Sequence, residues 1–308
     1  MFWEHIPLLW LIFVGITLIF LALDLGAFGR KEHLGNMKEA VLWSAIWIAV
    51  ALSFNFAIYL IYGHQKALSF LTGYLVEESL SIDNIFVFIV IFSYFKIPSV
   101  HQRKILFWGI IGAIVIRALF IVLGLSLIHR FHWIIYLLGG LLIMTGIQLT
   151  LEKDKEIHPD HNPVLKFMKR FVPITNEYSD GKLFIKKNAK LYATPLFIAL
   201  LAVETTDIIF AVDSIPAILA ITTDPFIVYT SNIFAILGLR SLYFVLAGFM
   251  KMFYYLHYGL ACILVFIGIK MLISKIYNIP IAVTLIFILG TIIVSIVASI
   301  SHFRHKQE

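Results

Sequence analysis

The chain has 308 residues, of which 61% are hydrophobic and only 14% are charged. Soluble domains are about 45–50% apolar and about 25% charged, so this composition excludes an ordinary soluble protein and predicts a membrane protein. The formal net charge of +6 would suit a nucleic-acid binder, but the positions of the basic residues indicate membrane orientation instead.

Apolar stretches of about 20 residues, the length that crosses a bilayer as a helix, recur along the chain. The first lacks a preceding basic region and is too long for a signal peptide, so we expect it to span the membrane. The sequence predicts an all-α polytopic membrane helix bundle of about nine transmembrane helices, with residues 1–308 forming a single transmembrane domain. The expected spans are residues 7–28, 39–62, 68–95, 105–128, 133–151, 191–220, 227–249, 254–274 and 279–301.

Basic residues are distributed unequally between the two sides of this arrangement. The connections after the odd-numbered spans carry eighteen Lys and Arg residues. The N-terminus and the other connections carry four, if Lys270, at the end of its span, is counted with the connection that follows. Because cytoplasmic loops are the basic ones, we expect a bacterial inner-membrane protein with its N-terminus outside and its C-terminus in the cytoplasm. Residues 152–190 then form a cytoplasmic loop near anionic lipid headgroups, and no nucleic-acid partner is expected.

Two segments place their polar residues alike, each with an acid six residues before an Asp that a small polar residue follows. Because three spans separate equivalent points, the two copies cross the membrane in opposite directions. This pattern is typical of inverted-repeat transporters, whose site lies between the repeats near the midplane. We expect repeats of three-helix units over residues 68–151 and 191–274. The matching residues are Glu77, Asp83 and Asn84 in the first copy and Asp207, Asp213 and Ser214 in the second.

Six acids fall within the third and sixth expected spans. Left facing lipid they would cost about 15–20 kcal/mol, more than the net stability of most proteins. They must therefore face one another, a watery cavity, a cation or the two arginines within spans, Arg117 and Arg240. Pairing with both arginines leaves four negative charges for protons or a metal ion to balance. The alternative is that the acids only fix helix packing. The six are Glu77, Glu78, Asp83, Glu204, Asp207 and Asp213, of which Glu78 could face the extracellular interface.

The available donors select the kind of metal ion. Carboxylate, amide and hydroxyl oxygens suit Mg²⁺, Ca²⁺ or Mn²⁺. The histidines lie mostly at span ends or in loops, and Cys262 is the only cysteine, so a zinc or copper site is disfavoured. The predicted metal ligands are Glu77, Asp83, Asn84, Glu204, Asp207 and Asp213, with Asp24, Ser214, Asn232, Arg117 and Arg240 as supporting residues.

Helix geometry limits how these ligands can meet. Six residues advance about 240° around a regular helix, so Glu77 and Asp83 do not share a face, whereas Glu77 and Asn84 do. A compact site that uses both acids of each copy therefore requires local unwinding. Pro216 offers a cause in the sixth span, because it clashes with the carbonyl of residue 212 and donates no amide proton.

At these residues the sequence resembles the TerC family of integral membrane proteins. The strings that carry the resemblance begin at Glu77, at Val203 and at Thr230, and they extend to Asn84, to Ala217 and to Phe244. The resemblance covers essentially the whole chain and includes Asp24 with the basic pair that follows it. It implies manganese export from the cytosol and a LysE-type exporter-like architecture. The family takes its name from tellurium resistance, which we interpret as an indirect phenotype because carboxylates repel oxyanions.

The sequence hypothesis is therefore a secondary exporter of a hard divalent cation, Mn²⁺ first, with protons as a possible coupling ion. No enzymatic activity and no permanently bound cofactor are expected. An alternative is a membrane-embedded assembly or metal-delivery partner of the secretion machinery, which would use the cytoplasmic loop as its contact surface. An intramembrane aspartyl hydrolase is disfavoured, because the acids recur as ligand-like sets and no scissile-substrate motif is evident.

Overall fold

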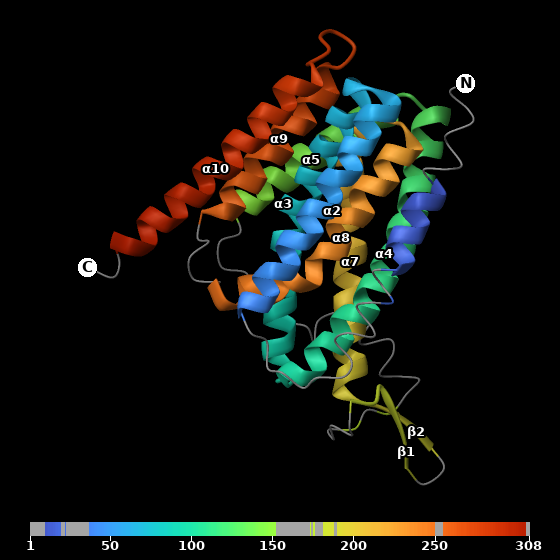
Figure 1. Ribbon diagram of the computed structural model, residues 1–308, viewed down its shortest axis with the longest axis vertical. Helices are drawn as coiled ribbons and strands as arrows, with labels where there is room; N and C mark the ends of the chain where they lie inside the picture. The colour runs from blue at the N-terminus through green and yellow to red at the C-terminus, as the bar shows by residue number, and fades with distance from the viewer. Residues whose placement is uncertain are drawn as a thin grey trace.

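The computed structural model of the chain describes residues 10–19, 22, 37–151, 173, 175, 181–187, 190–249 and 255–305. Within them almost every residue is helical, and the predicted all-α polytopic bundle is confirmed (Figure 1). The elements are the short helix Trp10–Ile19, α2 (Met37–Tyr62), α3 (His64–Tyr94), α4 (Ser99–Arg130), α5 (Ile134–Leu151), β1 (Phe184–Lys187), β2 (Lys190–Ala193), α7 (Pro195–Leu219), α8 (Pro225–Phe249), α9 (Leu256–Ile273) and α10 (Ile281–His305).

Seven of the helices in the described part of the chain are long and apolar enough to cross a membrane, namely α2, α4, α5 and α7 to α10. With 31 residues, α3 has about 46 Å of length, more than a bilayer requires, but its acids make it less apolar than these seven. The helix Trp10–Ile19 covers part of the first expected span. The expected spans thus correspond to helices. Two of these helices do not meet the criteria for a membrane span by themselves, because Trp10–Ile19 is too short and α3 is less apolar.

The start of α7 differs from the prediction, which placed a span over residues 191–220. Residues 190–193 instead form β2, which pairs antiparallel with β1 and projects from one end of the bundle in Figure 1. The helix begins at Pro195, because proline suits the first turn, where its missing amide proton is not needed. The cytoplasmic loop predicted over residues 152–190 lies largely outside the described residues.

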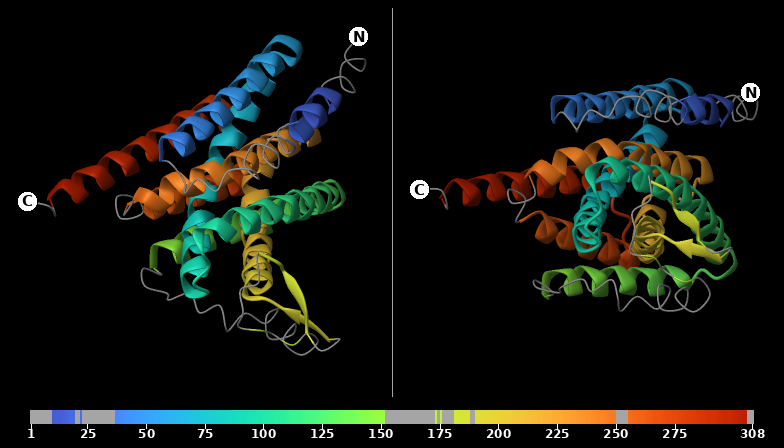
Figure 2. Two further views of the ribbon diagram at one scale, coloured as in Figure 1. Left: turned by 60° about the horizontal axis from the view of Figure 1, so that its bottom comes forward. Right: turned by 90° about the horizontal axis from the view of Figure 1, so that it is seen from below.

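Helices α3 and α7, which carry the acids, pack against each other near the middle of the bundle. In addition α3 packs on α8, and α7 packs on α4. Figure 2 shows α2 on one side of these helices and α5 on the other. Exchanging α3–α5 with α7–α9 maps the main helix pairs onto one another, since α3 with α8 becomes α7 with α4 and α5 with α9 is unchanged. The inverted repeat itself stays a prediction.

Glycines bring α5 and α9 into close contact. A Cβ on Gly139 would lie 3.0 Å from the carbonyl oxygen of Gly268, and a Cβ on Gly268 would lie 2.7 Å from that of Gly139. A Cβ on Gly146 would similarly lie 2.8 Å from the carbonyl of Ala261. These glycines therefore serve close helix packing, as is common where membrane helices touch backbone to backbone.

Candidate cation site between four helices

Arg117 of α4 joins four helices at the centre of the bundle. Its side chain is only 2% exposed, and it forms an ion pair with Glu77 of α3. The same guanidinium nitrogen, Nη1, lies 2.8 Å from Oδ1 of Asn232 on α8 and 3.2 Å from Oγ of Ser214 on α7. One buried cation thus gathers a carboxylate, an amide and a hydroxyl oxygen from three different helices.

This polar centre is not fully satisfied. Glu77 is fully buried, yet only its Oε1 atom contacts Arg117, and Oε2 has no hydrogen-bond partner in the described part of the chain. The same holds for Nε of Arg117 and Nδ2 of Asn84 within the described residues. Most buried polar atoms are paired with protein or ordered water, so this cluster leaves room for a further polar ligand.

Asp207 of α7 lies beside the same arginine. It is 5% exposed and lines, with Arg117, a cavity of about 10 Å³. That volume is close to the space of one water molecule, which needs about 10–15 Å³ on this measure. The remaining walls are mostly apolar and come from α3, α4, α7 and α8, including Phe88, Gly109 and Ile236. Glu77 and Asp207, one acid from each predicted repeat, therefore both face Arg117.

Glu204 lies one turn before Asp207 on α7 and faces α4. A Cβ added to Gly112 would overlap its carboxylate, so the missing side chain of Gly112 makes room for this acid. Oε2 of Glu204 is buried and has no hydrogen-bond partner among the described residues. Glu204, Asp207 and Ser214 thus form a polar stripe along one face of α7, at spacings of three and seven residues.

Asp213 lies on a different face of α7, toward α5. The hydroxyl of Thr145 donates a hydrogen bond of 2.9 Å to Oδ1 of Asp213. Sequence reasoning did not single out Thr145, because one Thr in an apolar span carries no signal by itself. Its hydrogen bond to Asp213 depends on the packing of α5 against α7 in the folded bundle.

The predicted ligands therefore do not all converge. In the part of the chain that the structure describes, no three His, Cys, Asp or Glu side chains are close enough to hold one metal ion. The expected unwinding is absent, since α3 is a continuous helix and α7 continues through Pro216 to Leu219. Asp83, which is half-buried, consequently points away from the face of Glu77. The six-residue ligand set stays a prediction for the ion-bound protein.

The other candidates fall in three places. Asp24 lies outside the described residues. Arg240 is 8% exposed and buried within α8. Glu78 does not face the extracellular interface as an open carboxylate, because its Oε2 atom is buried without a hydrogen-bond partner among the described residues and its carboxyl group interacts with Tyr74. Lys270 does not belong to the connection that follows its span: it is buried in α9 and donates a 3.0 Å hydrogen bond to Thr284 of α10.

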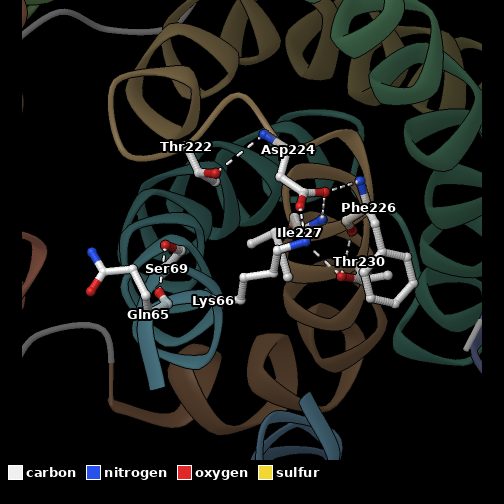
Figure 3. Close-up of polar contacts among 8 residues, drawn as sticks. All are labelled: Gln65, Lys66, Ser69, Thr222, Asp224, Phe226, Ile227 and Thr230. Atoms are coloured by element: carbon white, nitrogen blue, oxygen red, sulfur yellow. Dashed lines mark hydrogen bonds and ion pairs between the residues drawn. The ribbon is translucent and has the colours of Figure 1, made fainter. Parts of the chain in front are cut away.

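An ion pair joins α3 to the start of α8 at the end of the bundle where both helices begin. Lys66 Nζ lies 2.8 Å from Oδ2 of Asp224, and Oδ1 of Asp224 accepts the amide protons of Phe226 at 3.0 Å and Ile227 at 3.4 Å (Figure 3). Asp224 therefore caps the N-terminus of α8 and ties it to α3. The two positions lie 158 residues apart, and no sequence pattern connects them.

We expect Asp224→Ala to lower the free energy of unfolding by about 1 kcal/mol, because it removes the cap of α8. Lys66→Met should change it by less than about 1 kcal/mol, since the lysine side chain is 44% exposed and its ion pair is screened by water. Thermal unfolding in one detergent measures both. Equal losses in the two variants would contradict the capping role.

Comparison with known proteins assigns the chain to a family. Residues 62–308 match the family described as integral membrane protein TerC family. The chain belongs to the TerC family. The resemblance read from its acidic motifs is thereby confirmed.

Relatives of similar length share nearly half of their residues with this TerC protein. An uncharacterized membrane protein of Myxococcus xanthus, STKORF319, is 49% identical over 97% of this chain and 94% of its own length. A proposed membrane-bound redox modulator of Escherichia coli strain K12, Alx, is 46% identical over 98% of this chain and 97% of its own. An uncharacterized membrane protein of Rickettsia felis is 43% identical over 94% and 97%. No solved structure gives a significant match.

Proposed function

We propose that this protein exports a hard divalent cation, Mn²⁺ first, from the cytosol by secondary transport. The observation that carries the proposal is that two buried carboxylates, Glu77 and Asp207, face one arginine at the crossing of four helices. The cluster adds only amide and hydroxyl oxygens, from Asn232 and Ser214. Oxygen donors of this kind suit Mn²⁺, Mg²⁺ and Ca²⁺.

The charges at the crossing fit a divalent ion. Two carboxylates against one guanidinium leave one formal negative charge in the ion-free protein. If Arg117 withdraws, the same two carboxylates balance the charge of one divalent cation. Arg117 thus acts as the counter-ion of the empty site, since an uncompensated acid at membrane depth is costly. Protons that return to these carboxylates would complete the cycle and couple export to the proton gradient.

The preference for manganese rests on the family resemblance and not on the geometry. The name of the Escherichia coli relative describes a redox role. This chain cannot form an intrachain disulfide, because Cys262 is its only cysteine. Cation transport uses the oxygen donors that this chain does bury, and it leaves Cys262 without a required role.

The experiment is uptake of Mn²⁺ into inside-out vesicles that contain the purified protein, with and without a proton gradient. We expect uptake by the wild type and a loss of at least tenfold in Glu77→Gln and in Asp207→Asn, the two acids that face Arg117. Asp224→Asn is the matched control, because Asn also caps helices and Asp224 lies at the end of the bundle. Wild-type uptake in both variants, correctly inserted, would overturn the carboxylate site.

A second function, docking to an assembly or secretion partner, is favoured by the hairpin of β1 and β2. The hairpin projects from the bundle (Figure 2). Phe184 is 36% exposed and Leu191 is 54% exposed, and the strand register places both on the same face of the hairpin. A protein that uses this surface alone would show no flux in vesicles under any gradient. It would instead lose a co-purifying partner in Phe184→Ser with Leu191→Ser.

A further inference from the structure

The polar cluster around Arg117 lies between two unlike halves of the bundle. The hairpin of β1 and β2 marks one end, where α4 and α7 begin and α3 and α8 end (Figure 1). The small cavity beside Arg117 lies on the hairpin side of the cluster, because in all four helices its other lining residues lie closer to that end than the cluster residue does. Examples are Phe88 on α3, Gly109 on α4, Val203 on α7 and Ile236 on α8.

On the other side of the cluster, the end of α7 fills the space between α3 and α4. Its residues Ile218 and Leu219 are only 1% and 5% exposed. A Cβ on Gly73 of α3 would overlap Cδ1 of Ile218, and a Cβ on Gly124 of α4 would lie 2.8 Å from Cδ1 of Leu219. The two glycines thus form notches that receive these side chains. The Gly73 notch is one helical turn, about 6 Å, from Glu77 on α3. We call the segment 216–222 the plug.

A gap in the hydrogen-bond ladder of α7 separates the plug from the rest of the helix. Pro216 lies inside α7 and has no amide proton, so it cannot donate a hydrogen bond to the carbonyl of residue 212. Prolines are the usual sites at which helices bend. In the matching segment of α3, Phe86 stands where Pro216 stands in α7, so only one of the two copies has this gap. The plug can therefore tilt about Pro216 while the part of α7 that carries the acids keeps its place.

The helices around the plug are joined by contacts that do not involve α7. The ion pair of Lys66 and Asp224 ties α3 to the start of α8. Ser231 of α8 is fully buried beside Gly73, and its hydroxyl donates a 2.7 Å hydrogen bond to the carbonyl of Ile227 in its own helix. Neither contact has to break when the plug moves, so α3 and α8 provide a fixed frame for it.

We propose that the plug is the gate that closes the cation path at the end of the bundle opposite the hairpin. The gate opens when α7 bends at Pro216 and Ile218 and Leu219 leave the notches at Gly73 and Gly124. Bending of a helix at a few residues is a common means of opening and closing a site. The predicted orientation places this end outside, where an exported ion leaves. The gate rests on the proposed transport function, but its opening can be measured without any transported ion.

Labelling of a buried cysteine with a membrane-impermeant maleimide tests the gate. Ser231→Cys, beside the Gly73 notch, is the reporter, and Cys262→Ser removes the only native thiol of the full-length protein. The labelling rate is measured in vesicles of both orientations. Lys66→Cys, made separately, shows which membrane face lies at the end opposite the hairpin, because Lys66 is 44% exposed there.

Two substitutions at Ile218 weaken the closed gate to different extents. Ile218→Val removes Cδ1, the atom that enters the notch, at a small cost in stability, and Ile218→Ala removes more of the side chain. Ile209→Val and Ile209→Ala are the matched controls, because Ile209 is 60% exposed on α7 and precedes Pro216. Pro216→Ala restores the missing amide donor and should stiffen the helix at the hinge.

We expect the reporter to be labelled at least tenfold faster in Ile218→Ala and at least threefold faster in Ile218→Val, only from the face that labels Lys66→Cys. The Ile209 variants should leave the rate unchanged, and Pro216→Ala should lower it at least threefold when added to Ile218→Val. Thermal unfolding confirms that each variant is folded. Unchanged labelling in folded Ile218 variants, or faster labelling from the hairpin side, would overturn the gate, and an unchanged rate on adding Pro216→Ala would overturn the hinge.

Uptake of Mn²⁺ by the same vesicles is read separately, so the gate and the proposed function can fail independently. The expected labelling without any uptake by the wild type would support the gate and overturn the transported ion. Uptake by the wild type with labelling that does not respond to Ile218 would overturn the gate and leave the transport function standing.

Discussion

Replacing Arg117 by Met is expected to destabilise the protein by about 3–5 kcal/mol, because it leaves the buried Glu77 carboxylate without its counter-charge. The double variant Glu77→Gln with Arg117→Met should recover most of this loss, since no ionised group then remains unpaired. Thermal unfolding of the wild type, both single variants and the double variant gives the coupling energy.

Transport by the same four proteins separates a cation site from a packing ion pair. If Glu77 binds the transported ion, the double variant regains stability but still takes up no Mn²⁺. If the pair only holds α3 and α4 together, uptake should return together with stability. Lys66→Met is the matched control, because it also breaks an ion pair between helices, but an exposed one worth at most about 1 kcal/mol.

Gly112→Ala is the second substitution with a large expected effect. The added methyl group would overlap the carboxylate of Glu204, which can move aside because it lies at the end of a flexible side chain. The fold should therefore survive while the acid leaves its place beside α4. Groups that position a metal ligand typically contribute 10–100-fold to metal affinity or activity, so we expect Mn²⁺ uptake to fall by about that factor.

Two comparisons make the result for Gly112→Ala interpretable. Gly140→Ala is the control, because a Cβ at Gly140 has no atom within 4 Å. Glu204→Gln should lose uptake to the same extent, and adding Gly112→Ala to it should cause little further loss. Full uptake by folded Gly112→Ala would show that the position of Glu204 beside α4 does not matter for transport.

Helix positions could be predicted because they depend on local properties of the chain. Stretches of about 20 apolar residues must form helices in a bilayer, where no water satisfies the backbone. The start of α7 could not be predicted, since residues 191–193 are apolar enough to extend the span but belong to β2, which pairs with β1. The strand β1 lies only two residues before β2, but hydropathy alone does not distinguish a short apolar strand from the first turn of an apolar helix.

The partners of each acid depend on helix rotation and on neighbours that are distant in sequence. Periodicity indicated that Glu77 and Asp83 lie on different faces of one helix, but not that Pro216 would leave α7 unbroken. Pairing within the membrane was expected for Arg117, whereas its contacts with Ser214 and Asn232 required α7 and α8 to be placed. Thr145 and Gly112 had no signal in the sequence at all.

The sequence by itself thus determined a membrane-embedded helix bundle, its family and the residues too costly to face lipid, because hydrophobicity and charge act residue by residue. Only the tertiary structure decided that Glu77 pairs with Arg117, that Asp207 lines a cavity beside the same arginine, and that Asp213 bonds to Thr145. The physical reason is that a buried charge is stabilised by whichever groups the packing brings within a few ångströms, and that packing is a property of the whole bundle.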